Sequence, residues 1–308
     1  MKKILVTGGN GYVGSRIVTQ LMNKGHYVTV TSRKRNQEWH PLLRTIYLDA
    51  SKDSIGEELL RDVDVVLHLI SPSEKMCRDN PDLARKTIVG GTHNLVSAAE
   101  KYGTPRIIYL STVQVYGANL VGEINEKSPV DPQNPYALYH LDAEEIVNSY
   151  LGESISVRLA NSFGYPDNPE ADCWSLVTNS LMKEVVINGT LTLKSSGLSH
   201  RNFIPMSDVV NCLEHLVNEI NPSILHRVIN LGLQESRAIL EMAQRVSSQF
   251  YLQTGKEVEI QTMPQDLNEA VSSFQLNLDM LSSLGINIRG NIDNEISESL
   301  MKIRSWNS

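Results

Sequence analysis

A hydroxyl, a phenol and an imidazole occur in the middle of the chain at a spacing that could bring them together. Tyr136 and His140 lie four residues apart in a helical pattern, so their side chains point to the same face of that helix. Thr112 follows Ser111, just after a strand-like run over residues 106–110. Side chains of these types can transfer protons. We therefore treat Thr112, Tyr136 and His140 as candidates for acid–base chemistry.

A glycine-rich segment near the start of the chain is typical of a dinucleotide site. It reads Thr7-Gly8-Gly9-Asn10-Gly11-Tyr12-Val13-Gly14, with a β-type run before it and an apolar helical repeat after it. Gly8 allows a tight turn, Gly11 lets the main chain approach a pyrophosphate, and Gly14 lets the helix pack closely on the sheet. A strand-to-helix turn without a ligand remains the alternative.

The elements that must position these residues follow an alternating pattern. Strand-like runs occur at residues 27–30, 45–48, 63–70, 106–110 and 154–159. The longest helical patterns between them span about 82–102 and 135–151. Short strands separated by helices imply parallel pairing through right-handed crossovers. We predict an α/β fold with a doubly wound parallel Rossmann sheet.

The regular alternation fades after residue 164. The later part mixes short β-type runs at 228–230 and 258–261 with helical patterns at 239–250 and 293–302. We predict a dinucleotide-binding domain over residues 1–164, its sheet completed by pieces near 200–232. Residues 165–308 would then form a smaller, discontinuous substrate-binding lobe, with the ligand cleft between the two parts.

Composition narrows the class of protein. The 308 residues are 41% hydrophobic and 20% charged, and the net charge of −7 argues against nucleic acid as a partner. No stretch is long and apolar enough for a membrane span, and the apolar N-terminal run is too short for a signal peptide. The three cysteines lack metal-ligand spacing, as do His26, His68 and His93. We expect a cytoplasmic protein without a metal site.

The turn after the second strand bears on the choice of nicotinamide cofactor. NAD is usually bound there by an acidic residue that contacts the ribose 2′-hydroxyl. This sequence reads Thr31-Ser32-Arg33 instead, with further basic residues following. A small hydroxyl followed by cations suits a 2′-phosphate, so NADP(H) is favoured over NAD(H), with Ser32 and Arg33 as the contacts. The alternative is a solvated basic turn.

Taken together and in order, a series of motifs resembles the extended short-chain dehydrogenase/reductase family, in its NAD-dependent epimerase/dehydratase group. The resemblance covers nearly the whole chain. The matching pieces are the glycine-rich segment, Asp64-Val65-Val66-Leu67-His68-Leu69, Gly91-Thr92-His93-Asn94-Leu95, Tyr109-Leu110-Ser111-Thr112, Val115-Tyr116-Gly117, Tyr136 with its helix, Arg158-Leu159-Ala160-Asn161-Ser162-Phe163-Gly164, Arg201-Asn202-Phe203-Ile204 with Asp208-Val209, and Asn230-Leu231-Gly232.

The resemblance implies roles for individual residues. Tyr136 would donate or accept a proton at a sugar carbonyl or hydroxyl, and Thr112 would hydrogen-bond the same oxygen. Gln114 would also contact the substrate, while Asn161 and Arg201 would hold the phosphates of a nucleotide-diphosphate sugar. The cofactor would contact Gly8, Gly11, Tyr12, Val13, Gly14, Ser32, Arg33, Asp49 near the adenine, Ala50, Leu69, Ser71, Tyr136 and His140.

Two positions depart from the family pattern. The family motif is Tyr-x-x-x-Lys, but His140 stands where the lysine is expected. A neutral imidazole could bind a ribose hydroxyl, and a protonated one could stabilise phenolate. In the second case the rate of keto reduction should fall as pH rises past the His140 pKa. Ile88 replaces an asparagine, so a proton-relay or helix-bending contact is expected to be lost.

The expected activity is NADP-dependent reduction of a keto group in a nucleotide-activated sugar, of the 4-keto reductase type. In the family such reductases consume NADPH, and the acidic pair common in dehydratases is replaced here by Val113-Gln114. A nucleotide-sugar epimerase is the alternative enzyme. A catalytically weak NADP-binding sensor or scaffold is the alternative from another class. By resemblance to family dimers, helices 82–102 and 135–151 would pair in a homodimer.

Overall fold

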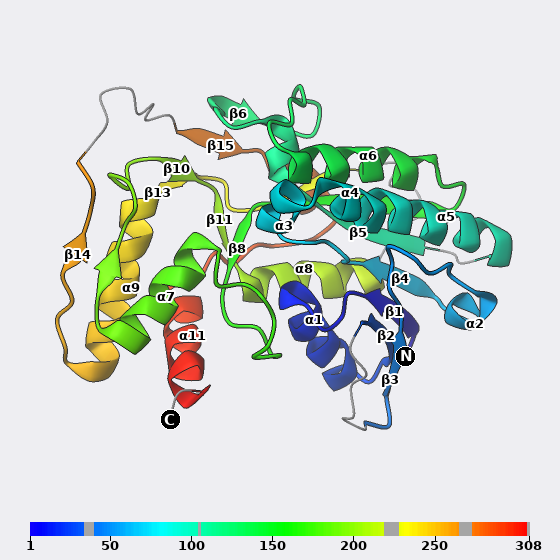
Figure 1. Cartoon of the computed structure of the whole chain (residues 1–308), viewed down its shortest axis with the longest axis horizontal. Helices are drawn as coiled ribbons and strands as arrows, with labels where there is room; N and C mark the ends of the chain where they lie inside the picture. Colours follow the sequence, from blue (N-terminus) through cyan, green and yellow to red (C-terminus); the bar gives the residue numbers. More distant parts are fainter. Residues whose placement is uncertain (34–39, 104–105, 219–227, 265–272, 307–308) are drawn as a thin grey trace.

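A parallel sheet forms the centre of the computed structural model, which describes residues 1–33, 40–103, 106–218, 228–264 and 273–306. Its seven strands lie in the order β12-β7-β5-β4-β1-β2-β3. Figure 1 labels five of them, β5, β4, β1, β2 and β3. They are β1 (Lys3–Thr7), β2 (Tyr27–Ser32), β3 (Leu43–Tyr47), β4 (Val65–His68), β5 (Arg106–Thr112), β7 (Glu153–Leu159) and β12 (Val228–Leu231). Every neighbouring pair is parallel. The doubly wound Rossmann-type sheet predicted from the sequence is confirmed.

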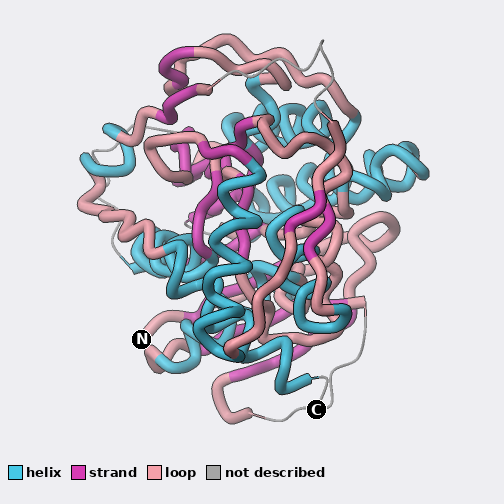
Figure 2. Tube along the Cα trace, turned by 90° about the vertical axis from the view of Figure 1, so that its left-hand side faces the viewer, coloured by secondary structure: helices cyan, strands magenta, loops and turns pink. Residues whose placement is uncertain are grey.

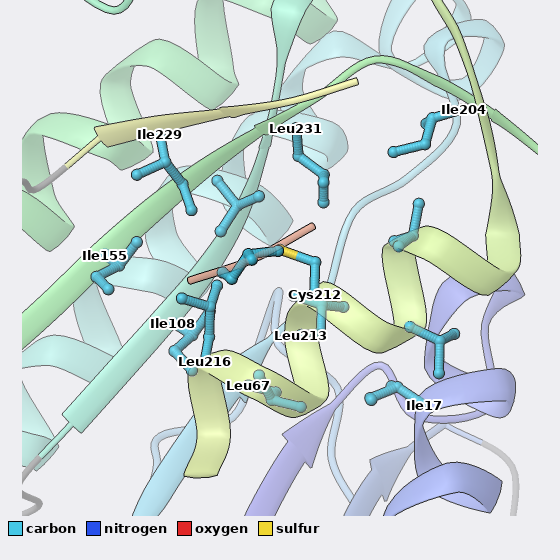
Figure 3. Close-up of a cluster of buried hydrophobic side chains, with 14 of the residues drawn as sticks. Ile17, Leu67, Ile108, Ile155, Ile204, Cys212, Leu213, Leu216, Ile229 and Leu231 are labelled. Atoms are coloured by element: carbon cyan, nitrogen blue, oxygen red, sulfur yellow. The ribbon is translucent and has the colours of Figure 1, made fainter. Parts of the chain in front are cut away.

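Side chains alternate between two cores on the two faces of this sheet. Along β1, Ile4 and Val6 face one core and Leu5 faces the other. The first core lies against α1 (Tyr12–Asn23) and α8 (Met206–Asn218). Figure 3 shows Leu213 of α8 within this core. Because strand side chains alternate with a period of two, a sheet that is helix-covered on both faces buries nearly every strand residue.

The second core lies against α5 (Gly91–Tyr102) and α6 (Pro135–Ser149). Three shorter helices accompany them: α2 (Glu57–Leu60), α3 (Glu74–Asp79) and α4 (Pro81–Arg85). The helical pattern predicted over residues 82–102 is one continuous run, but it contains a π-helical turn, η1 (Lys86–Gly90). A π-helical turn inside a longer helix is a local bulge of the helix axis.

The π-helical turn includes Ile88, which stands where the family pattern has an asparagine, and other side chains make contacts there. The Thr92 hydroxyl donates to the carbonyl oxygen of Ile88 at 2.6 Å. Since the hydroxyl has one proton, Nε2 of His68 must donate to it across their 3.0 Å contact. Nδ1 of His68 then accepts from the Thr7 hydroxyl at 2.7 Å. These side chains join the end of β1 to the bulged helix without an asparagine.

A second group of helices lies beside the main sheet. It consists of α7 (Val177–Asn188), α9 (Ile239–Thr254) and α11 (Ile292–Trp306), which share a third core. Figure 2 views the molecule from the side on which this group lies. The end of α7 is marked by Gly189 at φ +69°, and that of α9 by Gly255 at φ +68°. Glycine adopts such left-handed conformations without strain.

Four short strand pairs lie outside the main sheet. β8 (Asn161–Phe163) pairs with β11 (Phe203–Pro205), β10 (His200–Arg201) with β13 (Arg237–Ala238), β9 (Leu191–Thr192) with β14 (Ile260–Gln261), and β6 (Gly122–Ile124) with β15 (Phe274–Leu276). The remaining short helices are η2 (Val113–Tyr116) and α10 (Asp279–Ser283). Of the pieces near 200–232, β12 joins the main sheet, whereas β10 and β11 pair outside it. The domain division at residue 164 stays a prediction.

Candidate functional site

The glycine-rich segment has the geometry of a cradle for phosphate groups. Gly8 has φ +72°, and a Cβ added to it would lie 3.1 Å from the backbone of Leu69. A Cβ on Gly14 would overlap the carbonyl oxygen of Gly8, so α1 packs directly on the turn. Helix α1 begins after Gly11, and no side chain caps its first turn. Its free N–H groups therefore suit a pyrophosphate.

The end of β2 carries the residues expected to choose between NAD and NADP. The Ser32 hydroxyl accepts a hydrogen bond from Nδ2 of Asn10, at 2.9 Å, which ties it to the glycine-rich segment. Arg33 follows and is exposed. The rest of the basic turn, residues 34–39, lies outside the described residues. Ser32 and Arg33 are thus next to the cradle, and no acidic side chain stands at either position.

The other expected cofactor contacts lie around the same end of the sheet. Asp49 uses its carboxylate within its own turn: Oδ1 accepts from the Ser51 amide and hydroxyl at 3.1 and 2.7 Å, and Oδ2 pairs with Lys52 at 3.2 Å. The Ser51 hydrogen bond is the largest cause that lowers the Asp49 pKa. Ala50 is buried. Any adenine contact by Asp49 must share oxygens that are already engaged.

His140 is held from both sides of its ring. Nδ1 lies 2.6 Å from the Tyr109 hydroxyl, and Nε2 lies 2.9 Å from the Ser71 hydroxyl. The Ser71 hydroxyl donates to the carbonyl oxygen of Pro72 at 3.0 Å, so Nε2 donates to Ser71 and Tyr109 donates to Nδ1. Burial, with a smaller contribution from His68, lowers the His140 pKa to about 3. Of the two forms considered from the sequence, this lowered pKa favours the neutral imidazole.

The Tyr136 ring packs against the His140 ring at a tilt of 59°, with ring centroids 4.5 Å apart. The expectation that the two side chains share one helix face is therefore confirmed. Removal of the phenol from water is the largest cause that raises the Tyr136 pKa to about 12, and Cys77 and Glu74 act in the same direction. The side chain where the family motif expects an ammonium is neutral. Tyr136 is therefore protonated throughout the physiological range.

The segment after β5 is tied to the start of the helix that carries Tyr136. The Thr112 hydroxyl accepts from the amide of Gln114 at 3.2 Å, and Oε1 of Gln114 accepts from Nδ2 of Asn134 at 3.0 Å. Asn134 also caps α6, because its Oδ1 accepts from the Ala137 amide at 2.9 Å. The sequence analysis missed Asn134. The signal was an asparagine followed by proline at a helix start, which is a common N-cap pattern.

Buried charges fix α6 to the sheet beneath the site. Glu144 lies one helical turn after His140 and is 2% exposed. Its carboxylate accepts from Nη2 of Arg158 on β7 at 2.7 Å and from the Ser111 hydroxyl at 2.5 Å. A buried pair of this kind costs desolvation energy but holds its two elements in one arrangement when fully paired. It positions the helix that presents Tyr136.

Asn161 and Arg201 come together through Asn202. Both the amide and Nδ2 of Asn161 donate to the carbonyl oxygen of Asn202, each at 3.0 Å. Arg201 is exposed, and its Nη1 donates to the carbonyl oxygen of His200 at 2.8 Å.

Within the described ranges, no cluster of histidine, cysteine, aspartate and glutamate side chains could hold a metal ion, and no helix could span a bilayer.

Comparisons with known proteins give relatives over most of the chain. UDP-glucuronic acid decarboxylase 1 of Danio rerio is 35% identical over 263 residues, which cover 80% of this chain and 60% of the relative. The dTDP-D-glucose 4,6-dehydratase of Homo sapiens is 27% identical over 294 residues, which cover 87% of this chain and 79% of the relative. The chain spans 60–64% of the length of the UDP-glucuronic acid decarboxylase 1 relatives that it matches.

Solved structures share the fold. UDP-glucuronic acid 4-epimerase of Bacillus cereus, solved in complex with UDP-glucuronic acid and NAD, superimposes with a TM-score of 0.83 over 99% of both chains at 20% identity. The model of the NAD dependent epimerase/dehydratase family matches residues 4–232. The match spans the phosphate cradle, the Thr112–Tyr136 region and β12. The chain belongs to the NAD-dependent epimerase/dehydratase family.

Proposed function

We propose that the protein reduces a keto group of a nucleotide-diphosphate sugar, with NADPH as the reductant. The observation that carries this proposal is the packing of the Tyr136 ring against the His140 ring, where burial raises the Tyr136 pKa and lowers the His140 pKa. Reduction of a ketone needs a proton donor at the carbonyl oxygen, whereas oxidation of an alcohol needs a base. With its pKa raised to about 12, Tyr136 carries at neutral pH the proton that reduction requires. Only about one molecule in 10⁵ would hold Tyr136 as phenolate.

The residues around Tyr136 suit a carbonyl substrate. Thr112 lies at the end of β5, and its segment is bound to the cap of α6 through Gln114. Thr112 would hydrogen-bond the reacting oxygen and so orient the carbonyl toward the phenol. Gln114, Asn161 and Arg201 would contact the remainder of the substrate. The class of substrate is supported by the UDP and dTDP sugars named for the relatives.

The bound nicotinamide would supply the hydride, and the glycine cradle would hold its pyrophosphate. Ser32 and Arg33 would contact the 2′-phosphate of NADP(H), since neither is acidic and Arg33 is exposed. The solved relative from Bacillus cereus holds NAD, so the preference needs a direct test. Calorimetric titration should give tighter binding of NADPH than of NADH. Arg33→Ala should remove the difference, and equal affinities in the unchanged protein would refute the preference.

The reaction is tested with a panel of UDP-linked and dTDP-linked keto sugars and NADPH. We expect NADPH oxidation with at least one keto sugar, and a loss of at least about a hundredfold in Tyr136→Phe. Interconversion of hydroxyl sugars without net NADPH use would favour the epimerase alternative. Binding of NADP without turnover would favour the sensor or scaffold alternative, which the absence of an ammonium at His140 supports.

We also propose a cytoplasmic homodimer that pairs through the outer face of α5 and α6. These helices pack on each other and cover one face of the sheet. Leu138 on α6 is 45% exposed. Pairing of such faces about a two-fold axis is a common form of closed assembly. Light scattering should give twice the monomer mass, and Leu138→Lys should lower it; a monomer at micromolar concentration would reject the dimer.

A further inference from the structure

We propose that Tyr109 is a positioning residue that keeps the neutral His140 ring in the tautomer with its proton on Nε2. This inference rests on the proposed cofactor site, where His140 would contact a ribose hydroxyl, and it adds a residue outside the predicted site. It starts from the two nitrogens of the ring, which face different surroundings. Nδ1 faces Tyr109 of β5, which is fully buried, and Nε2 faces Ser71, which is exposed beyond the end of β4.

The Tyr109 hydroxyl determines which nitrogen carries the proton. Its oxygen lies 2.6 Å from Nδ1 of His140, and no other acceptor within the described ranges contacts it. Burial, together with Tyr136 and Glu144, raises the Tyr109 pKa, so the phenol keeps its proton. A buried hydroxyl proton needs an acceptor, and Nδ1 is an acceptor only when it is unprotonated. The ring proton is therefore on Nε2.

The other tautomer would break two hydrogen bonds. With its proton on Nδ1, the ring would donate to the Tyr109 oxygen and leave the phenol proton without a partner in the core. Nε2 would then have to accept from Ser71, whose single proton goes to the carbonyl oxygen of Pro72 at 3.0 Å. All donors in this chain of groups are paired only when it runs from Tyr109 toward Pro72.

Ring contacts hold the imidazole in the plane that these hydrogen bonds require. Its centroid lies 5.7 Å from that of Tyr109, with 28° between the ring planes, and 4.5 Å from that of Tyr136. His140 is 1% exposed. A half-turn of the ring would put carbon atoms at both contacts, so the nitrogens cannot exchange places without losing Tyr109 and Ser71 as partners.

The consequence is a neutral hydrogen-bond donor on the exposed side of the ring. An ammonium donates from three protons in any orientation, whereas a neutral imidazole donates from Nε2 in only one of its two tautomers. By holding that tautomer, Tyr109 would let His140 donate to a ribose hydroxyl without placing a charge beside Tyr136. Tyr109 acts through His140 and does not itself touch the cofactor.

The first experiment is NMR of the full chain with 15N-labelled histidine, because protonated and unprotonated ring nitrogens have widely separated shifts. We expect an unprotonated Nδ1 and a protonated Nε2 for His140. Ser71→Ala removes the partner of Nε2 but leaves Tyr109 in place, so the shifts should stay those of a single tautomer. Adding Tyr109→Phe to Ser71→Ala should give averaged shifts of both tautomers. The matched control adds Tyr116→Phe instead, which removes another buried phenol hydroxyl, bonded to Asn230 at 2.7 Å, and should change neither shift.

The second experiment is calorimetric titration of the same variants with NADPH and with NADH. Tyr109→Phe in the Ser71→Ala background should weaken cofactor binding roughly threefold, since one hydrogen bond is made by only part of the molecules. Tyr116→Phe in that background should leave the affinity unchanged.

A proton on Nδ1 of the unchanged protein, or mixed tautomers in Ser71→Ala alone, would overturn the inference. Equal shifts with and without Tyr109→Phe would overturn it as well. A mixed tautomer with unchanged cofactor affinity would refute the role of Nε2 toward the ribose. A fixed tautomer and tight cofactor binding, without reduction of any keto sugar, would keep the role of Tyr109 and refute the proposed reaction.

Discussion

The neutral His140 beside Tyr136 allows one substitution to test the proton chemistry of the site. His140→Lys would place an ammonium where the ring now lies, and the ring centroids of the two residues are 4.5 Å apart. At roughly 5 Å and an effective dielectric constant of about 20, a unit charge stabilises phenolate by about 3 kcal/mol. That energy corresponds to about two pKa units. The Tyr136 pKa should fall from about 12 to roughly 10.

In the unchanged protein, keto reduction and alcohol oxidation should respond differently to pH. In the unchanged protein, keto reduction should be independent of pH from about pH 6 to about pH 9, because Tyr136 stays protonated and His140 stays neutral over that range. Oxidation of the alcohol product should rise about tenfold per pH unit, because it needs phenolate. In His140→Lys, oxidation should be faster at a given pH by up to about a hundredfold, since the phenolate fraction rises by two powers of ten while the phenolate becomes a weaker base. Reduction should rise by the same factor in kcat/KM, because the equilibrium constant of the reaction is unchanged.

The assay follows NADPH absorbance in both directions across the pH range. His140→Gln is the matched control: it is polar and uncharged, so it should not accelerate oxidation. If His140→Lys is no faster than His140→Gln, the electrostatic account of Tyr136 is refuted. A reduction rate that falls with a midpoint near the ordinary histidine pKa would show that His140 titrates there, against the effect of its burial.

Two further predictions concern the framework of the site. Glu144→Gln leaves the buried Arg158 guanidinium without its carboxylate, so urea denaturation should show a free energy of unfolding lower by about 3 kcal/mol. The same change at exposed Glu57 should leave the unfolding midpoint in place, and equal effects would contradict the argument. Gly14→Ala drives its Cβ into a backbone carbonyl, so calorimetry should show at least about tenfold weaker cofactor binding. Gly90→Ala, whose Cβ meets open space, should bind cofactor normally; equal binding by both variants would refute the steric reasoning.

The sheet was predictable because its signals are local. Buried strands give continuous apolar runs, helices give a period near four residues, and the glycine-rich turn joins the first strand to the first helix. The four-residue spacing of Tyr136 and His140 likewise predicted that both side chains lie on one face of α6. The spacing of residues along one helix determines the directions of their side chains relative to one another, because they share a helix axis. The spacing gives no information on which other residues pack around that helix face.

The charge of His140 could not be predicted from the sequence, because it depends on the residues that surround the ring. Its two hydrogen-bond partners, Tyr109 and Ser71, stand 31 and 69 residues away in the sequence. Only the packing of α6 against β5 and the loop after β4 brings them to the ring. The π-helical turn at Ile88 follows the same rule, because it depends on Thr92 and on His68 from β4. The contacts of His140, and that of His68 with Thr92, join residues far apart in the sequence, so local patterns could not predict them.

His140 stands where the family motif has a lysine, and the missing ammonium group bears on which reactions of the family Tyr136 could support. An epimerase must oxidise and then reduce its sugar, so its tyrosine has to accept a proton before it returns one. A one-way reductase needs only the donor, and a phenol whose pKa is about 12 meets that need. The Ser32-Arg33 turn, at the end of β2, supports NADPH on independent grounds. The non-acidic turn at the end of β2 and the neutral side chain beside Tyr136 are therefore two separate features that agree with the proposed reduction.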